Sequence, residues 1–302
     1  MVRPLLALSV IVAAAAAAVD AQQGPAAVPS RSHTVYVTVT EATGRPVLDL
    51  ASDEFAVKED GKVREVLQAA VASAPLQIMI IVDDNGTGLF RSGLVQFVQQ
   101  FPGRAEIALS SVTGQTQLLV DYTRDLDRVV NAVVTLTARP GTNDGGQLLE
   151  GIFESARTQE KREAQRPVIV ALTVGGEEHS TLPAHHVLDQ LAKSGSALYV
   201  IQVAGASLRP TVPITQSRQL LGENLNLSEV LGEGPKQSGG WREEIAAAPG
   251  IVSGLRRIAA ALRAQYAVEY SRPPRGKALE KLDVSVRRRG LNLRAPTKVA
   301  GR

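Results

Sequence analysis

The stretch "LQIMIIVDDNGTG" at residues 76–88 decides how the rest of the chain is interpreted. It begins as a nearly unbroken apolar run, which is typical of a parallel strand buried on both faces. At Asp83 it changes to acidic, polar and glycine residues, as expected of a turn. Similar apolar runs recur at 167–173 and 197–204. Together they predict an α/β chain with a doubly wound, mostly parallel, Rossmann-like sheet.

Amphipathic helices are expected between these strands, because apolar residues recur there at helical spacing. The segments with this periodicity are 89–101, 126–133, 148–156, 183–193 and 251–262. The loops that follow the strands should gather at the carboxyl edge of the sheet, where α/β proteins usually bind ligands.

Both ends of the chain show period-two alternation, around Val35–Val39 and Tyr266–Tyr270, which indicates half-buried strands. The Asp60-Gly61 pair predicts a tight hairpin turn, since both central positions of such a turn need positive φ. Because neither end supplies enough strand partners alone, we expect a small all-β unit formed by the N- and C-terminal segments.

The predicted organisation places the α/β domain between two parts of this β unit. In chain order it comprises a signal peptide (1–21), a linker (22–32), the first part of the β unit (33–73), the α/β domain (75–264, with an irregular, partly helical insertion at 205–249) and the second part of the β unit (265–296).

The N-terminal segment has the features of a secretory signal. Arg3 precedes an apolar run at 5–19, and small residues lead to a cleavage point after Ala21. A membrane anchor is the alternative, but the run is short for a bilayer span. We therefore expect an exported protein, periplasmic or secreted, without a stable membrane span after cleavage.

The composition narrows the function further. Hydrophobic residues make up 44% and charged residues 21% of 302 residues, as in ordinary globular proteins. The net charge of +3 is small and gives no support to a nucleic-acid partner. The absence of cysteine excludes disulfides, thiol catalysis and thiolate metal sites.

The order of elements, the turn after the first central strand and the loop "PGTNDGG" at 140–146 resemble a von Willebrand factor type A domain. The flanks at 37–66 and 255–294 are similar to those of bacterial exported VWFA-related domain proteins, so the resemblance spans about 34–296. It implies the type A fold, a protein-binding function and a metal-ion-dependent adhesion site.

That site, as implied by the resemblance, has the pattern Asp-x-Ser-x-Ser, a Thr in a second loop and an Asp after a later strand. The matching positions here are Asp83, Asn85, Thr87 and Thr142, and Val174 stands where the last Asp is expected. Their oxygens suit Mg²⁺ or Mn²⁺. The alternative is a relic turn whose Asp and Thr side chains cap the next helix.

Other kinds of site find less support in the sequence. Neither the P-loop nor the dinucleotide fingerprint is present. His179, His185 and His186, with Glu177 and Glu178, make a zinc site conceivable, but their spacing favours an exposed polar loop. There is no G-x-S-x-G elbow, so we predict no catalytic residues and no enzyme activity.

The sequence thus predicts an exported protein-binding or adhesion-type module that uses the carboxyl edge of its sheet, with at most a weak dependence on Mg²⁺ or Mn²⁺. The alternative is a metal-independent scaffold or assembly component of the cell envelope. A hydrolase is the third and least favoured reading.

Overall fold

The structure, a computed structural model, describes residues 31–84, 86–136, 146–203, 217–272 and 279–300. The predicted signal peptide, most of the predicted linker and much of the "PGTNDGG" loop lie outside these ranges. None of the described helices is both long enough and apolar enough to cross a membrane.

The central sheet has six strands in the order β10-β9-β8-β5-β6-β7. All neighbours are parallel except β6 and β7, which form an antiparallel pair at one edge. The strands are β5 Leu76–Asp83, β6 Ala105–Thr113, β7 Gln115–Thr123, β8 Pro167–Thr173, β9 Ala197–Val203 and β10 Arg242–Ile245. Every residue of β8 is buried, as its unbroken apolar sequence predicts.

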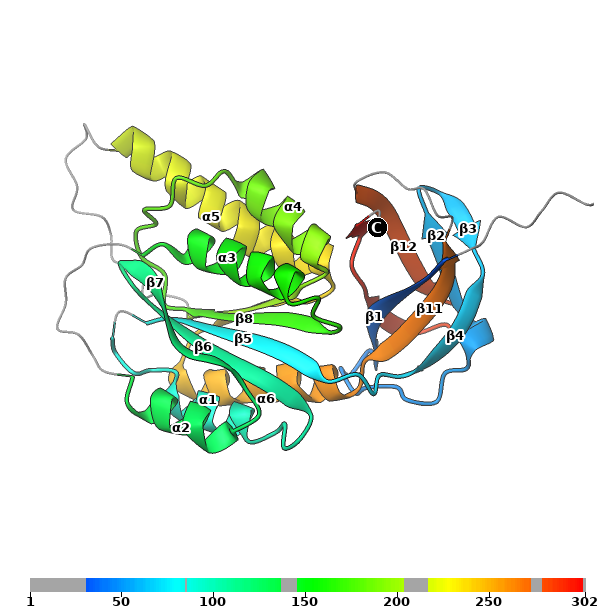
Figure 1. The fold of residues 1–302 in the computed structure, drawn as a ribbon, viewed down its shortest axis with the longest axis horizontal. Helices are drawn as coiled ribbons and strands as arrows, with labels where there is room; N and C mark the ends of the chain where they lie inside the picture. Colours follow the sequence, from blue (N-terminus) through cyan, green and yellow to red (C-terminus); the bar gives the residue numbers. More distant parts are fainter. Residues whose placement is uncertain (1–30, 85, 137–145, 204–216, 273–278, 301–302) are drawn as a thin grey trace, which may run out of the picture.

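Helices cover both faces of this sheet (Figure 1). One layer consists of α1 Arg91–Val98, α2 Leu126–Val134 and α6 Ala248–Arg263. The other consists of α3 Leu148–Lys161, α4 Ala184–Ser194 and α5 Ser217–Ser238. Two apolar clusters fill the spaces between the sheet and these layers.

The chain ends form two four-stranded sheets, ordered β13-β1-β11-β4 and β14-β12-β2-β3. Their strands are β1 Arg31–Glu41, β2 Phe55–Glu59, β3 Lys62–Arg64, β4 Val66–Val71, β11 Tyr266–Arg272, β12 Leu279–Val286, β13 Leu291–Arg294 and β14 Lys298–Ala300, and a short 3-10 helix, η1, spans Ser52–Glu54. N-terminal β1 and β2 pair with C-terminal β11 and β12. The predicted fold class is therefore confirmed: a mostly parallel α/β sheet with an all-β unit built from both ends.

The β2–β3 hairpin turns at Asp60 and Gly61, whose φ values of 48° and 77° are both positive, as the Asp-Gly pair predicts. The first strand differs from the prediction, because β1 begins at Arg31, two residues inside the predicted linker.

The segment 205–249 was predicted to be irregular and partly helical; its described part contains the long helix α5 and also the strand β10, which was not predicted. Glycines and Pro235 make α5 a poor helix by propensity. Buried Val230 and Leu231 pack into the same apolar cluster as α4 and β9 residues. Tertiary packing therefore decides the structure here.

The two edges of the central sheet have different surroundings. The amino ends of the parallel strands face the β unit, and the carboxyl ends lie at the opposite end of the molecule (Figure 1).

Candidate functional site

Asp83 is the last residue of β5, and it lies beside Thr173, the last residue of β8, at the carboxyl edge of the sheet. The Thr173 hydroxyl donates a hydrogen bond of 2.6 Å to Asp83 Oδ2. Burial raises the pKa of Asp83 to about 6; the Thr173 hydrogen bond opposes this shift, and the neighbouring Asp84 adds to it. Asp83 is thus a carboxylate held away from water, and its side-chain hydrogen-bond donor is the neutral Thr173 hydroxyl.

Asp84 organises the turn that follows. Its carboxylate accepts hydrogen bonds from the Gly86 N–H at 2.9 Å and the Gly88 N–H at 2.8 Å. Both glycines have positive φ, 71° and 69°, which side-chain-bearing residues rarely adopt. Asp84 therefore stabilises the turn itself. The alternative predicted from the sequence, that the Asp and Thr side chains of this turn cap the next helix, does not hold for α1. This helix begins after Phe90 without a side-chain cap.

The predicted metal ligands are only partly described. Asp83 is buried, whereas Thr87 is exposed and its hydroxyl accepts a 3.3 Å hydrogen bond from the Leu89 N–H. Asn85 and Thr142 lie outside the described residues. The set of four ligands therefore stays a prediction.

Val174, at the position of the expected carboxylate, belongs to the apolar core. It is 5% exposed and lies in the same cluster as Val82 and Leu172. Its N–H donates to the Asp83 carbonyl at 2.9 Å, which continues the pairing of β8 with β5. At the carboxyl edge, Val174 therefore contributes a backbone hydrogen bond to Asp83 and no side-chain oxygen that could bind a metal.

Glu178 lies in the segment that the sequence predicts to be an exposed polar loop, and for this residue the prediction of exposure is wrong. Glu178 is 1% exposed and its carboxylate accepts hydrogen bonds from the N–H groups of Leu148 and Leu149, at 3.1 and 3.3 Å. These are free donors of the first turn of α3. Burial raises the pKa of Glu178 to about 8, although the two backbone bonds oppose the shift, and charges on Glu150 and Asp83 contribute to it.

Gly146 brings the loop before α3 close to Asp83. A Cβ at this position would lie 2.8 Å from Val112 Cγ1 and 3.6 Å from Asp83 Oδ1. The backbone of Gly146 also pairs with the 177–179 segment, through the Glu177 carbonyl and the His179 N–H, each at 2.8 Å. A side chain at 146 would therefore disturb the contact between this loop and β6.

The histidines do not gather into a metal site. His179 Nε2 lies 3.9 Å from Glu177 Oε2, and the His185 and His186 rings lie against each other with centroids 4.3 Å apart. Within the described ranges, no three or more His, Cys, Asp or Glu side chains are arranged to hold an ion. Ser180 is buried, and its hydroxyl accepts a bond from the Leu182 N–H.

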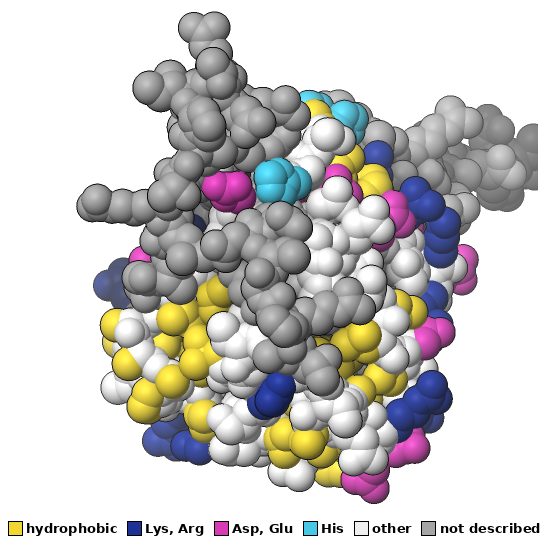
Figure 2. Space-filling view, turned by 90° about the vertical axis from the view of Figure 1, so that its left-hand side faces the viewer, with side chains coloured by type: hydrophobic (Ala, Val, Ile, Leu, Met, Phe, Trp, Pro, Cys, Tyr) yellow, Lys and Arg dark blue, Asp and Glu magenta, His cyan; other side chains and the backbone are white. Residues whose placement is uncertain are grey.

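The carboxyl edge seen from outside has two kinds of surface (Figure 2). Histidine side chains lie in the upper part of the view, hydrophobic side chains are most extensive on both sides of the lower part, and acidic side chains occur in the upper part and along the right-hand side. The edge thus combines polar and apolar patches, a mixture that protein interfaces also show.

Comparisons with known proteins find similarity at the level of structure. No family model and no curated protein matches the chain. A von Willebrand factor type A structure from Catenulispora acidiphila is 12% identical, with a TM-score of 0.48, and the match covers 89% of this chain and 75% of that one.

Two further structures are similar to about three fifths of the chain. The SpRpn10 VWA domain is 16% identical, with a TM-score of 0.40, covering 61% of this chain and 94% of that one. The BatB protein from Bacteroides thetaiotaomicron is 14% identical, with a TM-score of 0.45, covering 61% and 97%. Two of these three structures are named as von Willebrand factor type A or VWA domains.

Proposed function

We propose that the chain is an exported protein-binding module whose docking face is the carboxyl edge of the central sheet. The observation that carries this proposal is the pair of buried acids, Asp83 and Glu178, held at that edge. Buried carboxylates with raised pKa values lower the stability of the fold at neutral pH, and such groups concentrate at functional sites.

A strong divalent-cation site does not fit the described donors. Asp83 offers one carboxylate and Thr87 one hydroxyl, whereas Val174 is apolar and buried and Asp84 is bonded to its own turn. Mg²⁺ prefers near-octahedral oxygen coordination with carboxylates to offset its charge. We therefore propose docking that is independent of metal or depends on it weakly, with Asp83, Asn85, Thr87 and Thr142 as the residues of any weak site.

The dependence on metal is measured by titrating Mg²⁺ and Mn²⁺ into the mature protein and following its thermal midpoint. At a metal concentration equal to the dissociation constant, binding to the folded state adds RT ln 2, about 0.4 kcal/mol. At 10 mM metal we expect the free energy of unfolding of the wild type to rise by no more than this amount. For Asp83→Asn we expect no rise. A gain of several kcal/mol that Asp83→Asn abolishes would contradict weak or absent metal dependence.

The docking face is tested with a photo-crosslinking residue placed at Thr87, in an extract that contains the exported proteins of the source cells. The matched control carries the same residue at Lys62, an exposed position on β3 of the β unit. We expect one discrete adduct from position 87 and none from position 62. Adducts from position 62 alone would favour the scaffold alternative, with the β unit as the contact surface.

A further inference from the structure

A cavity lined by basic side chains lies at the amino edge of the central sheet, remote from the carboxyl edge. Its volume is ≈ 600 Å³. The described lining residues include four arginines, Arg104, Arg124, Arg166 and Arg263, and no acidic residue. We call this cavity the arginine groove.

The topology of the sheet brings the four arginines together from distant parts of the sequence. Arg104 precedes β6, Arg166 precedes β8, and Arg124 follows β7, which runs antiparallel to β6. Arg263 is the last residue of α6, next to the start of β11. Each arginine therefore reaches the edge of the sheet that faces the β unit.

Three of these arginines are exposed to solvent. Arg124 forms an ion pair, with its Nε 3.4 Å from Glu106 Oε1. Within the described part of the chain, Arg104 and Arg263 form no ion pair with an acidic side chain. Two of the three exposed arginines in the groove therefore lack an acidic partner among the described residues.

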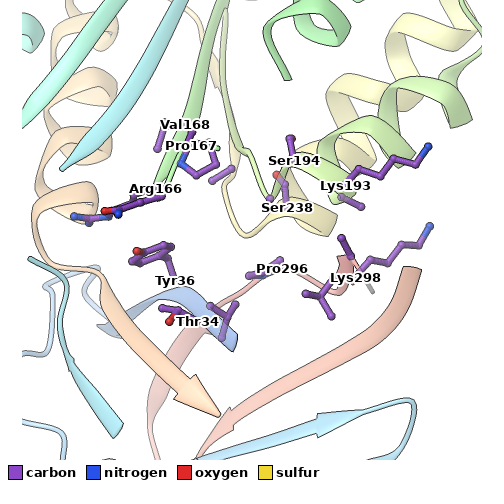
Figure 3. A pocket seen from close by; sticks show the side chains of 18 of the residues that line it. Thr34, Tyr36, Arg166, Pro167, Val168, Lys193, Ser194, Ser238, Pro296 and Lys298 are labelled. Atoms are coloured by element: carbon purple, nitrogen blue, oxygen red, sulfur yellow. The ribbon is translucent and has the colours of Figure 1, made fainter. Parts of the chain in front are cut away.

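Arg166 is 4% exposed and lies above the ring of Tyr36, with its guanidinium carbon 5.4 Å from the ring centroid (Figure 3). Its Nε and Nη2 donate to Gln265 Oε1 at 3.1 and 2.9 Å. Further bonds go to the carbonyl oxygens of Ala74 and Leu262.

All of these hydrogen-bond acceptors are neutral. Burial lowers the pKa of Arg166 to about 10, and electrostatic interactions with the Tyr36 and Tyr199 hydroxyl groups oppose this shift only in part. A buried cation in this position would be stabilised by an anion bound in the adjoining groove.

We propose that the arginine groove binds a multiply charged oxyanion of the phosphate class, supplied either as a free polyphosphate or as the phosphorylated headgroup of a lipid. Guanidinium groups match the oxygen pairs of phosphate with two parallel hydrogen bonds. A ligand with two or more negative charges corresponds to the excess positive charge of the groove. This site is separate from the carboxyl edge, so either proposal can fail without the other.

The test is isothermal titration calorimetry of pyrophosphate into the mature protein. The double variant R104Q/R263Q changes two exposed side chains, so we expect it to stay folded, which its thermal midpoint checks. The matched control is R256Q, another exposed arginine of α6 that does not line the groove. We expect saturable binding by the wild type, weakened about tenfold or more in R104Q/R263Q and retained in R256Q.

The proposal is overturned if the folded wild type shows no saturable binding at millimolar pyrophosphate and does not bind vesicles as described next. It is also overturned if R256Q weakens binding as much as R104Q/R263Q, since that would indicate attraction by net charge alone.

The source of the phosphate is identified by flotation with vesicles of phosphatidylcholine, with and without phosphatidic acid. Binding that requires phosphatidic acid, is lost in R104Q/R263Q and is displaced by pyrophosphate supports a lipid headgroup. Pyrophosphate binding without vesicle binding supports a free ligand.

Discussion

Glu178 shows how strongly position governs the behaviour of one side chain in this protein. Its neighbour Glu177 is partly exposed, whereas Glu178 is buried against the first turn of α3. The raised pKa means that the folded state binds a proton more tightly than the unfolded state does. Glu178 therefore contributes stability below about pH 4.5, and this contribution is lost as the pH rises through about 8.

Replacing Glu178 with Gln should remove this pH dependence, because the amide stays neutral while its oxygen can still accept a bond from α3. We expect Glu178→Gln to be more stable than the wild type at pH 8 by up to about 5 kcal/mol, and about equal to it at pH 4. Urea unfolding at several pH values measures the effect. Glu177→Gln is the matched control and should follow the wild type. Superimposable pH profiles for the wild type and Glu178→Gln would contradict the assignment.

Residue-scale reasoning from the sequence identified Asp83 at the end of a buried strand, and the structure places it there. The resemblance pointed to position 174, and the structure shows Val174 in the core. Thr173 was not predicted as part of the site. Its position next to Val174, at the end of the parallel strand that pairs with β5, was a signal that the sequence offered. Glu178 carried no such signal, because its partners lie thirty residues away on α3.

At the scale of elements, β10 depends on a close approach of backbones. Gly240, just before β10, lies against β9: a Cβ at this position would be 2.0 Å from the Leu198 carbonyl oxygen. The Val200 N–H donates to the Trp241 carbonyl at 3.0 Å, which begins the pairing of these strands. Only glycine leaves room for this contact.

We therefore expect Gly240→Ala to lower the free energy of unfolding by about 1–3 kcal/mol or more, since the added methyl group must displace backbone. The control is Gly232→Ala within α5, where the added Cβ meets no atom within 4 Å beyond its chain neighbours and the backbone of its own helix. That change should raise stability by up to about 1 kcal/mol through helix propensity. Chemical denaturation measures both. Equal stability of Gly240→Ala and the wild type would show that β10 is not held as described.

The elements themselves were predictable to different degrees. The strands β5, β8 and β9 and the five predicted helices follow from apolar periodicity, because each buries its own pattern of residues. The strand β10 was not predicted, since "REEI" has no apolar run and pairs only because Gly240 admits the chain beside β9. Helix α5 is stabilised by its contacts with the sheet and α4 despite its glycines.

At the scale of the whole molecule, the two ends of the chain are joined by a buried ion pair. Glu59 on β2 is fully buried, and its Oε1 lies 2.7 Å from Nε of Arg272 on β11. Arg64 contacts the other carboxylate oxygen at 3.1 Å. Because β2 and β11 lie in different sheets, this group connects the two sheets of the β unit.

Glu59→Gln should cost about 3–5 kcal/mol, because it removes the buried carboxylate charge that pairs with Arg272. The control is Arg288→Gln, which removes ion pairs to Glu54 and Asp49 that also join the chain ends but lie exposed. It should cost about 1 kcal/mol or less. Equilibrium unfolding compares the two variants. A similar small loss for both would mean that the buried group does not stabilise the β unit.

The sequence by itself determined the α/β class, the alternation of buried strands and amphipathic helices, and the need of the chain ends for each other as strand partners. These features follow from local patterns, because burial of a strand or a helix face leaves its period in the residues themselves. Only the tertiary structure decided that Val174 packs inward, that Glu178 binds the first turn of α3, and that four arginines meet at the amino edge. These depend on contacts between distant segments, whose positions are set by the packing of the whole sheet and its helices.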